Sequence, residues 1–309
     1  MKVVVLSGGV GGARFVRGVV DVLEPGDVTV IGNVGDDVEV LGMHVSPDLD
    51  SILYALAGVN DDKRGWGRAD ETWNALAAAT ELGGENWFRL GDRDIGLHLV
   101  RTELLRAGVP LSEATQRLAR SLGLEASLLP ATDDALRTFV ETAAGTFPFQ
   151  TWFVARGHRD DVDAVHYAGA PDATAAPGVL EALETADVIL IAPSNPYVSI
   201  GPILAVDEIR EALVGRRVPC VAVSPLVDGR AVKGPADRML RRLAGGTSPM
   251  HVAACYDGLI DVLVVDELDA PDAPVRGVGR TVVTQTLMHD EDASRRLARD
   301  VLDAAGALT

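Results

Sequence analysis

Short runs of aliphatic and β-branched residues recur along the chain, and they alternate with segments in which apolar residues return every three or four positions. The continuous runs are typical of strands buried on both faces of a sheet, and the longer period is typical of amphipathic helices. Their alternation predicts an α/β fold in which helices cover both faces of a mostly parallel, Rossmann-like sheet. The expected strands are residues 2–6, 28–32, 187–195, 218–225 and 261–267, and the expected helices are residues 13–23, 177–186, 205–214, 235–244 and 290–305.

The middle of the chain follows a different pattern. Helical periodicity dominates from about residue 50 to about residue 145, which predicts a mostly helical insertion between the two halves of the sheet. Two apolar segments after it, residues 149–157 and 163–169, are expected to form two further strands, in antiparallel arrangement. The prediction is therefore a single α/β domain over residues 1–309 that carries this insertion.

Composition narrows the class of protein. The 309 residues carry a formal net charge of −17, and an acidic surface of this kind repels nucleic acid. The chain has no apolar run long enough to span a membrane and no basic leader followed by a cleavage motif. Cys220 and Cys255 lie in apolar surroundings and are expected to be unpaired thiols in a reducing compartment. We therefore expect a cytoplasmic protein that acts on small molecules.

A glycine-rich turn follows the first expected strand. Gly8, Gly9, Gly11 and Gly12 stand directly before the first helical pattern, and Arg14 follows them. The segment lacks the Lys-Ser or Lys-Thr of the nucleotide-triphosphatase loop, and Arg14 stands where the dinucleotide fingerprint has its third glycine. Glycines still allow a ligand to approach the backbone, and the unpaired N–H groups of a helix start favour an anion. A phosphate site is the preferred interpretation, and a tight turn without a ligand is the alternative.

A polar segment follows the second expected strand, first with Asn33, Asp36 and Asp37 and then with a pair of carboxylates after Ser46 and Pro47. Asp48 and Asp50 flank one leucine, and in an extended segment both would point to the same side. Paired carboxylates suit a Mg²⁺ ion that also binds substrate phosphates. The alternative is that Ser46, Asp48 or Asp50 simply caps the helix that follows.

Three further polar segments add candidate binding groups. Arg89 belongs to "RLGDRD", in which arginines can hold polar or anionic parts of a substrate, although a solvated loop with local ion pairs explains the segment equally. Ser194 and Asn195 lie between two prolines at the end of an expected strand, where they suit contacts to a phosphate or a base edge unless they form a plain turn. Lys233 precedes an expected helix start, which suggests a second anion site.

The sequence gives no sign of a zinc site or of a serine hydrolase. The six histidines are scattered, without the spacing of a zinc site, and no G-x-S-x-G elbow marks a serine hydrolase. One or two phosphate sites, a candidate Mg²⁺ pair and no evident covalent nucleophile point to phosphoryl-type transfer between bound substrates.

Taken together, these segments resemble a known family. "SGGVGGARF", "SPDLDSILYALAG", "RLGDRD", "APSNPYVSIGPIL" and "SPLVDGRAVKGPA" are similar, in the same order and over nearly the whole chain, to the 2-phospho-L-lactate transferases of coenzyme F420 biosynthesis. The resemblance implies a Mg²⁺-dependent transferase. It joins a three-carbon phosphoacid from a guanosine diphosphate ester to the ribityl hydroxyl of the deazaflavin Fo and releases GMP. The resemblance implies an enolpyruvyl donor in actinobacterial members and a lactyl donor in archaeal members. Because this chain is rich in Ala, Val, Arg and Asp, as proteins of high-GC bacteria are, we expect the enolpyruvyl donor. The resemblance also implies a homodimer.

The resemblance assigns roles to residues. It implies that Asp50 and Arg89 contact the deazaflavin. We further expect Asp48 and Asp50 to hold Mg²⁺, the glycines and Arg14 to hold the donor diphosphate, Ser194 and Asn195 to fix the nucleotide, and Lys233 to assist near the phosphates. Asp50 is also the candidate acceptor of the hydroxyl proton, so that Asp50→Asn is expected to remove turnover and leave the fold intact. Trp66, Trp73 and Trp87 are candidates to line the slot for the deazaflavin ring, with packed core tryptophans as the alternative.

Two other functions stay open. The same glycine turn and acidic pair would serve another nucleotide-diphosphate-dependent transferase, and preference for GDP over UDP would distinguish the two. A non-catalytic regulator that senses a phosphorylated metabolite would need the phosphate site but neither a metal pair nor a second substrate arginine.

Overall fold

The computed structural model describes residues 1–306. Its centre is a seven-stranded sheet in the order β14-β13-β10-β9-β1-β2-β5, and every neighbouring pair is parallel. The expected α/β fold with a parallel sheet is thereby confirmed. The strands are β1 (Val3–Ser7), β2 (Val28–Gly32), β5 (Ser127–Pro130), β9 (Val188–Ile191), β10 (Cys220–Val223), β13 (Val262–Asp266) and β14 (Arg280–Thr284).

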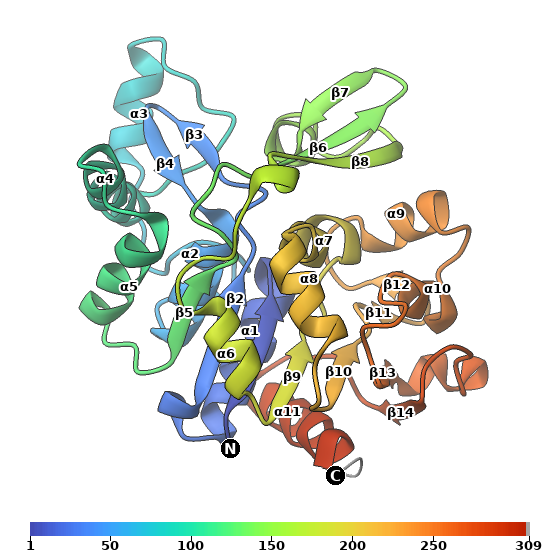
Figure 1. Cartoon of the computed structure of the whole chain (residues 1–309). Helices are drawn as coiled ribbons and strands as arrows, with labels where there is room; N and C mark the ends of the chain where they lie inside the picture. Colours follow the sequence, from blue (N-terminus) through green and yellow to red (C-terminus); the bar gives the residue numbers. More distant parts are fainter. Residues whose placement is uncertain (307–309) are drawn as a thin grey trace.

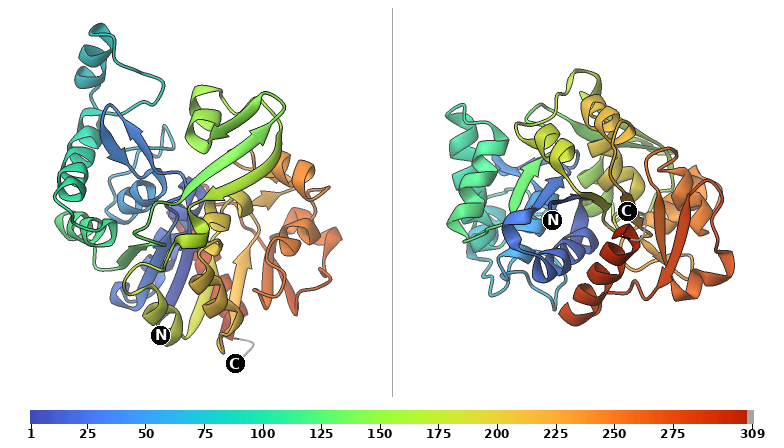
Figure 2. Two further views of the ribbon diagram at one scale, coloured as in Figure 1. Left: turned by 45° about the horizontal axis from the view of Figure 1, so that its top comes forward. Right: turned by 60° about the horizontal axis from the view of Figure 1, so that its bottom comes forward.

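Helices cover both faces of this sheet (Figures 1 and 2). Helix α1 (Gly9–Val22) packs against α2 (Pro47–Leu56) and α11 (Glu291–Gly306) on one face. Helices α6 (Val179–Thr185) and α8 (Asp207–Val214) pack together on the other face, as the right-hand view of Figure 2 shows. The four residues of β9 and of β10 are all buried, which explains why these strands are continuous apolar runs in the sequence.

The strand order reverses at the centre of the sheet. From β1 the chain moves outward through β2 to β5, and then returns to β9 on the other side of β1 and continues outward to β14. Ligands of open parallel sheets bind beyond the carboxyl ends of the strands at such a switch point. The segments that follow β1 and β9 are the glycine-rich turn and Pro193–Asn195.

The insertion differs from the prediction in its extent. Its helical part is α3 (Asn74–Glu81), α4 (Asp92–Arg106) and α5 (Leu111–Ser121), together with α2 before them. A short hairpin, β3 (Val38–Val40) with β4 (Met43–Val45), packs on α4. The helices end near residue 121, because residues 127–130 form β5 at the edge of the central sheet. This strand was missed because only four residues carry its apolar pattern.

A second, antiparallel sheet lies above the first (Figure 1). It consists of β7 (Gly145–Pro148), β6 (Arg137–Thr142) and β8 (Val162–Ala168), so the expected strand at residues 163–169 is confirmed. The expected strand at residues 149–157 is wrong, because residues 151–155 form a π-helical turn, η2 (Thr151–Ala155), that buries Trp152. The aromatic residues of this turn pack as a satellite core, which gives them an apolar run without a strand.

The rest of the chain completes the carboxyl-terminal half. It contains a π-helical turn η4 (Pro196–Ile200), helices α7 (Gly201–Leu204), α9 (Ala236–Leu243) and α10 (Pro249–Ala254), and a small ribbon of β11 (Leu226–Val227) with β12 (Arg230–Ala231). Short 3₁₀ turns are η1 (Pro25–Asp27), η3 (Ala170–Asp172) and η5 (Glu267–Asp272).

Within residues 1–306, none of the helices has both the length and the apolar character needed to cross a membrane.

Candidate functional site

The glycine-rich turn is the start of helix α1. The helix begins at Gly9, four residues earlier than predicted, so three of the four glycines lie in its first turn. Gly8, the residue before the helix, has no side chain to cap it, and the N–H of Gly9 faces the Asp48 carboxylate. Gly9 has φ +69°, a left-handed conformation that favours glycine. The anion site stays a prediction at this helix start.

Gly8 is where the glycine turn meets the acidic segment. A methyl group at Gly8 would overlap the Asp48 carboxylate and would lie 2.9 Å from Cβ of Ser199 and 3.2 Å from Cβ of Asn33. Four different segments therefore converge on this position, which only a residue without a side chain can occupy. The glycine turn and Asp48 therefore lie side by side, although they are about forty residues apart in the sequence.

Two serine hydroxyls contact the backbone of the glycine turn. Ser194 Oγ donates a hydrogen bond to the Gly8 carbonyl at 2.7 Å and accepts one from the Gly8 N–H at 3.3 Å. A methyl group at Gly12 would lie 2.5 Å from both Ser194 Oγ and Ser7 Oγ. Ser7 Oγ is buried and makes no hydrogen bond to any described residue. Ser194 thus positions the backbone of the glycine turn rather than presenting its hydroxyl outward.

A buried acidic cluster lies directly beside the turn. The Asn33 amide nitrogen donates hydrogen bonds to Asp36 and to Asp48, the latter at 2.9 Å, and the Gly9 N–H faces Asp48. Burial raises the pKa of both carboxyls, and the negative charges of neighbouring aspartates raise it further. No arginine, lysine or histidine of residues 1–306 pairs with either carboxylate, so a cation would be well placed here. Asp36 was given no role from the sequence, and the signal for it was its place four residues after the end of β2.

Asp50 lies apart from Asp48, because the two residues are in the first turn of helix α2 rather than in an extended segment. Asp48 faces the glycine turn, whereas both oxygens of Asp50 accept hydrogen bonds from the guanidinium of Arg101, one of them at 3.0 Å. Arg101 is fully buried, and the side chain of Asp50 is 6% exposed. The expectation of an extended Asp48–Asp50 pair is therefore wrong, and the carboxylate next to Asp48 is Asp36.

The buried ion pair changes what a substitution of Asp50 would do. His98 lies 3.7 Å from Asp50, and its pKa falls to about 4 because burial disfavours the charged ring. A neutral His98 leaves Arg101 as the only cation against Asp50 within the described part of the chain. Asp50→Asn would leave the Arg101 charge without its partner, so we expect this variant to lose stability as well as turnover.

Arg14 and Lys233 approach one loop from opposite halves of the molecule. Arg14 lies at the first turns of α1, donates a hydrogen bond to the Met288 carbonyl at 3.2 Å and forms an ion pair with Asp62 at 3.5 Å. Lys233 Nζ donates to the Gly65 carbonyl at 3.4 Å. The loop of residues 60–67 thus joins the two cations that were predicted, independently, to contact phosphates.

Arg89 belongs to an exposed group of aromatic and cationic side chains. Its guanidinium lies 4.7 Å from the ring centre of Trp73, and the guanidinium of Arg64 lies 4.9 Å from the same ring and 5.0 Å from that of Trp66. The two tryptophan rings meet edge to face at 6.3 Å. Trp66 is 39% exposed and Trp73 is half-buried, so these tryptophans are not packed core residues. Trp87 is separate from them, because it packs edge to face with Phe88.

The Asn195 side chain has a local structural task. Its Oδ1 accepts a hydrogen bond from the Tyr197 N–H at 2.9 Å, which caps turn η4, and its Nδ2 lies 3.4 Å from the sulfur of Met239. Both ends of the amide therefore have partners in the chain. This geometry supports the alternative of a turn at Asn195 more than a nucleotide contact.

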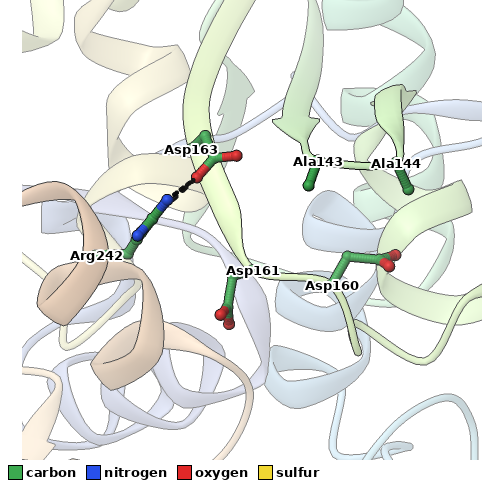
Figure 3. Close-up of a pocket in the computed structure, with 6 residues that line it drawn as sticks. All are labelled: Ala143, Ala144, Asp160, Asp161, Asp163 and Arg242. Atoms are coloured by element: carbon green, nitrogen blue, oxygen red, sulfur yellow. Dashed lines mark hydrogen bonds and ion pairs between the residues drawn. The ribbon is translucent and has the colours of Figure 1, made fainter.

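A separate surface pocket lies on the small sheet (Figure 3). Three aspartates line it, and Arg242 pairs with Asp163 across it. None of its residues belongs to the clusters predicted from the sequence. We assign it no function. Its lining residues are Ala143, Ala144, Asp160, Asp161, Asp163 and Arg242.

Comparison with known proteins places the chain in a family. Residues 3–305 match the family described as 2-phospho-L-lactate transferase CofD. The chain is 43% identical to a phosphoenolpyruvate transferase of Streptomyces coelicolor, with 99% of this chain and 98% of the relative covered. It is 39% identical to a 2-phospho-L-lactate transferase of Methanosarcina acetivorans, with 97% of each covered.

Solved structures confirm the fold alone. A member of the UPF0052 family from Bacillus halodurans aligns over 97% of this chain and 98% of its own with a TM-score of 0.63, at 18% identity. The match of residues 3–305, and the relatives that align over nearly their full length, agree with the order of motifs that the sequence presents. This chain belongs to the 2-phospho-L-lactate transferase CofD family.

Proposed function

We propose that the protein transfers a phosphoenolpyruvyl group from a guanosine diphosphate ester to the ribityl hydroxyl of the deazaflavin Fo, with GMP as the leaving group. The family and its relatives establish the coarser statement, a transferase of the phosphoenolpyruvate or 2-phospho-L-lactate type in coenzyme F420 biosynthesis. The bacterial relatives at 40 to 43% identity bear the name phosphoenolpyruvate transferase, which favours the enolpyruvyl over the lactyl donor.

One observation carries the proposal: the glycine turn and a buried acidic pair meet at the switch point of the sheet. The first turn of α1, where a helix presents N–H groups and a partial positive charge, suits the donor diphosphate, and Arg14 lies one turn further along the same helix. Asp36 and Asp48 fit Mg²⁺, because they are adjacent buried carboxylates without a cationic partner among residues 1–306. Bound Mg²⁺ would neutralise charge on the diphosphate.

The ring of the acceptor is proposed to lie on the side of α2 that carries Asp50, with its ribityl chain reaching the donor phosphorus at the glycine turn. Asp50 is held in one orientation by Arg101, and Asp94 at the end of the "RLGDRD" segment is close enough for the two carboxylates to repel each other. Trp66, Trp73 and Arg89 offer an aromatic and cationic surface that suits a deazaflavin ring. Asp50 would orient the attacking hydroxyl and accept its proton, while most of the acceleration comes from positioning.

The direct test is to incubate the protein with Fo, Mg²⁺ and, in separate reactions, the enolpyruvyl and lactyl guanosine diphosphate esters, and to look for the phosphodiester product by mass spectrometry. We expect product and GMP from the enolpyruvyl donor. Asp48→Asn should lower turnover by about a hundredfold or more. Asp161→Asn, a change of the same charge at an exposed position far from the glycine turn in sequence and structure, serves as the control. Release of GMP without a phosphodiester, or product from a uridine donor at an equal rate, would refute the proposal.

A further inference from the structure

The loop of residues 60–67 carries an acidic residue against the predicted donor site. Asp62 Oδ1 lies 3.5 Å from Arg14 Nη2 and accepts a hydrogen bond from the Asn60 amide at 2.8 Å. The side chain of Asp62 is 73% exposed, so burial does not require it to lie against Arg14. The ion pair instead joins two segments at the surface, because helix α1 contributes Arg14 and this loop contributes Asp62.

Lys233 belongs to the same group of charges. Its pKa falls because burial disfavours the ammonium and because the Arg14 charge repels it, while the Asp62 charge acts in the opposite direction. Two cations from different halves of the fold therefore lie close enough to repel each other, and one carboxylate offsets that repulsion. A phosphate of a ligand bound between Arg14 and Lys233 would be attracted to these two cations in the same way as the Asp62 carboxylate.

The loop itself is compact. The Asp61 carboxylate accepts a hydrogen bond from the Arg64 N–H at 2.9 Å, and the backbone N–H of Asp61 donates to the Gly67 carbonyl at 3.0 Å. A β-bridge joins Asn60 to Arg68. Within the loop, only the hydrogen bond from the Asn60 amide involves the Asp62 carboxylate, and the Oδ1 atom of an asparagine can still accept it. Asp62→Asn should therefore remove the charge and leave the conformation of the loop unchanged.

We propose that Arg14 and Lys233 form an anion subsite, and that Asp62 occupies it in the ligand-free chain as an internal competitor of the donor's phosphate. The inference rests on the proposed function for the identity of the donor, but the subsite itself requires only a phosphate-bearing ligand. Entry of that ligand displaces the Asp62 carboxylate from Arg14 and frees the tip of the loop. Asp62 thereby weakens the binding of anions and favours their release.

The test compares Asp62→Asn with Asp161→Asn in the full chain. Asp161 is a matched control, because it is 74% exposed and pairs with Arg238 at 2.9 Å on the small sheet. Dissociation constants for GDP and for inorganic pyrophosphate are measured by isothermal titration calorimetry. An exposed ion pair contributes about 0.2–1 kcal/mol, so we expect Asp62→Asn to bind both anions about two- to fivefold more tightly than the wild type, and Asp161→Asn to bind them unchanged.

A second background separates competition from a change in the loop. In Arg14→Met, the further change Asp62→Asn should raise the affinity for pyrophosphate by a smaller factor than it does in the wild type, because only Lys233 then remains for the carboxylate to compete for. Equal affinities in Asp62→Asn and Asp161→Asn, or weaker binding in Asp62→Asn, would overturn the inference even if the transfer reaction is confirmed. Tighter pyrophosphate binding by Asp62→Asn together with no binding of GDP would support the subsite and refute the guanosine donor.

Discussion

The buried pair of Asp50 and Arg101 gives the sharpest stability prediction. Arg101 is fully buried, the Asp50 side chain is 6% exposed, and both carboxylate oxygens accept from the guanidinium. Arg101→Met leaves a buried carboxylate without a cation, and Asp50→Asn leaves a buried cation without a carboxylate. Breaking a buried pair in this way costs about 3–5 kcal/mol, a large share of the roughly 5–15 kcal/mol that stabilises a typical native protein.

The double variant should behave differently from either single variant. Asp50→Asn combined with Arg101→Met leaves no buried charge, and we expect it to lose only about 1–2 kcal/mol relative to the wild type. The coupling energy between the two positions is therefore expected to exceed about 3 kcal/mol. Arg101→Lys keeps the charge but loses the two-pronged contact, and its stability should fall between those of the wild type and Arg101→Met.

The assay is urea unfolding at pH 7 followed by circular dichroism. Arg117→Met is the matched control, because Arg117 forms an exposed pair with Glu113 in α5 and its loss should change stability by less than about 0.5 kcal/mol. Additive effects of Asp50→Asn and Arg101→Met would refute the reasoning, as would an Arg101→Met variant as stable as the control. The folded double variant also separates chemistry from stability, since it lacks the Asp50 carboxylate and should have no turnover.

Three further predictions follow from close contacts, burial and exposure. Gly8→Ala should lose about 1–3 kcal/mol in urea unfolding because its methyl group overlaps Asp48, whereas Gly96→Ala, with nothing within 4 Å, should gain about 0.5–1 kcal/mol; equal midpoints would contradict this. Burial raises the pKa of Asp94 from 3.8 to about 6, so the folded state binds the proton more tightly and stability falls as pH rises through this window. Asp94→Asn should therefore be more stable than the wild type at pH 7.5, by on the order of 2 kcal/mol, and no more stable near pH 4; a gain that does not change with pH would exclude this cause. Trp73→Ala should raise KM for the deazaflavin about five- to tenfold and leave KM for the donor unchanged, and equal changes in both would rule out the proposed ring contact.

Single residues of the candidate site could be predicted from the sequence, but which side chains pair with one another could not. The glycine turn, Asp48 and Arg14 each lie where a motif at the end of a strand or the start of a helix would place them. Asp36 was noted after the second strand but given no role, because its partner Asp48 is twelve residues away and Asn33 joins the two through a side chain. Asp50 was paired with Asp48 on the assumption of an extended segment, which the helix start at Pro47 replaces.

The sequence by itself determined the parallel sheet and its covering helices, because burial on both faces requires continuous apolar runs and a helix requires its own period. It also determined the place of the glycine turn, since both flanking elements are local. Only the tertiary structure decided that Asp36 joins Asp48, that Arg101 neutralises Asp50 and that Asp62 lies against Arg14. Such pairings depend on the packing of segments far apart in the chain, and local periodicity carries no information about which charges that packing brings together.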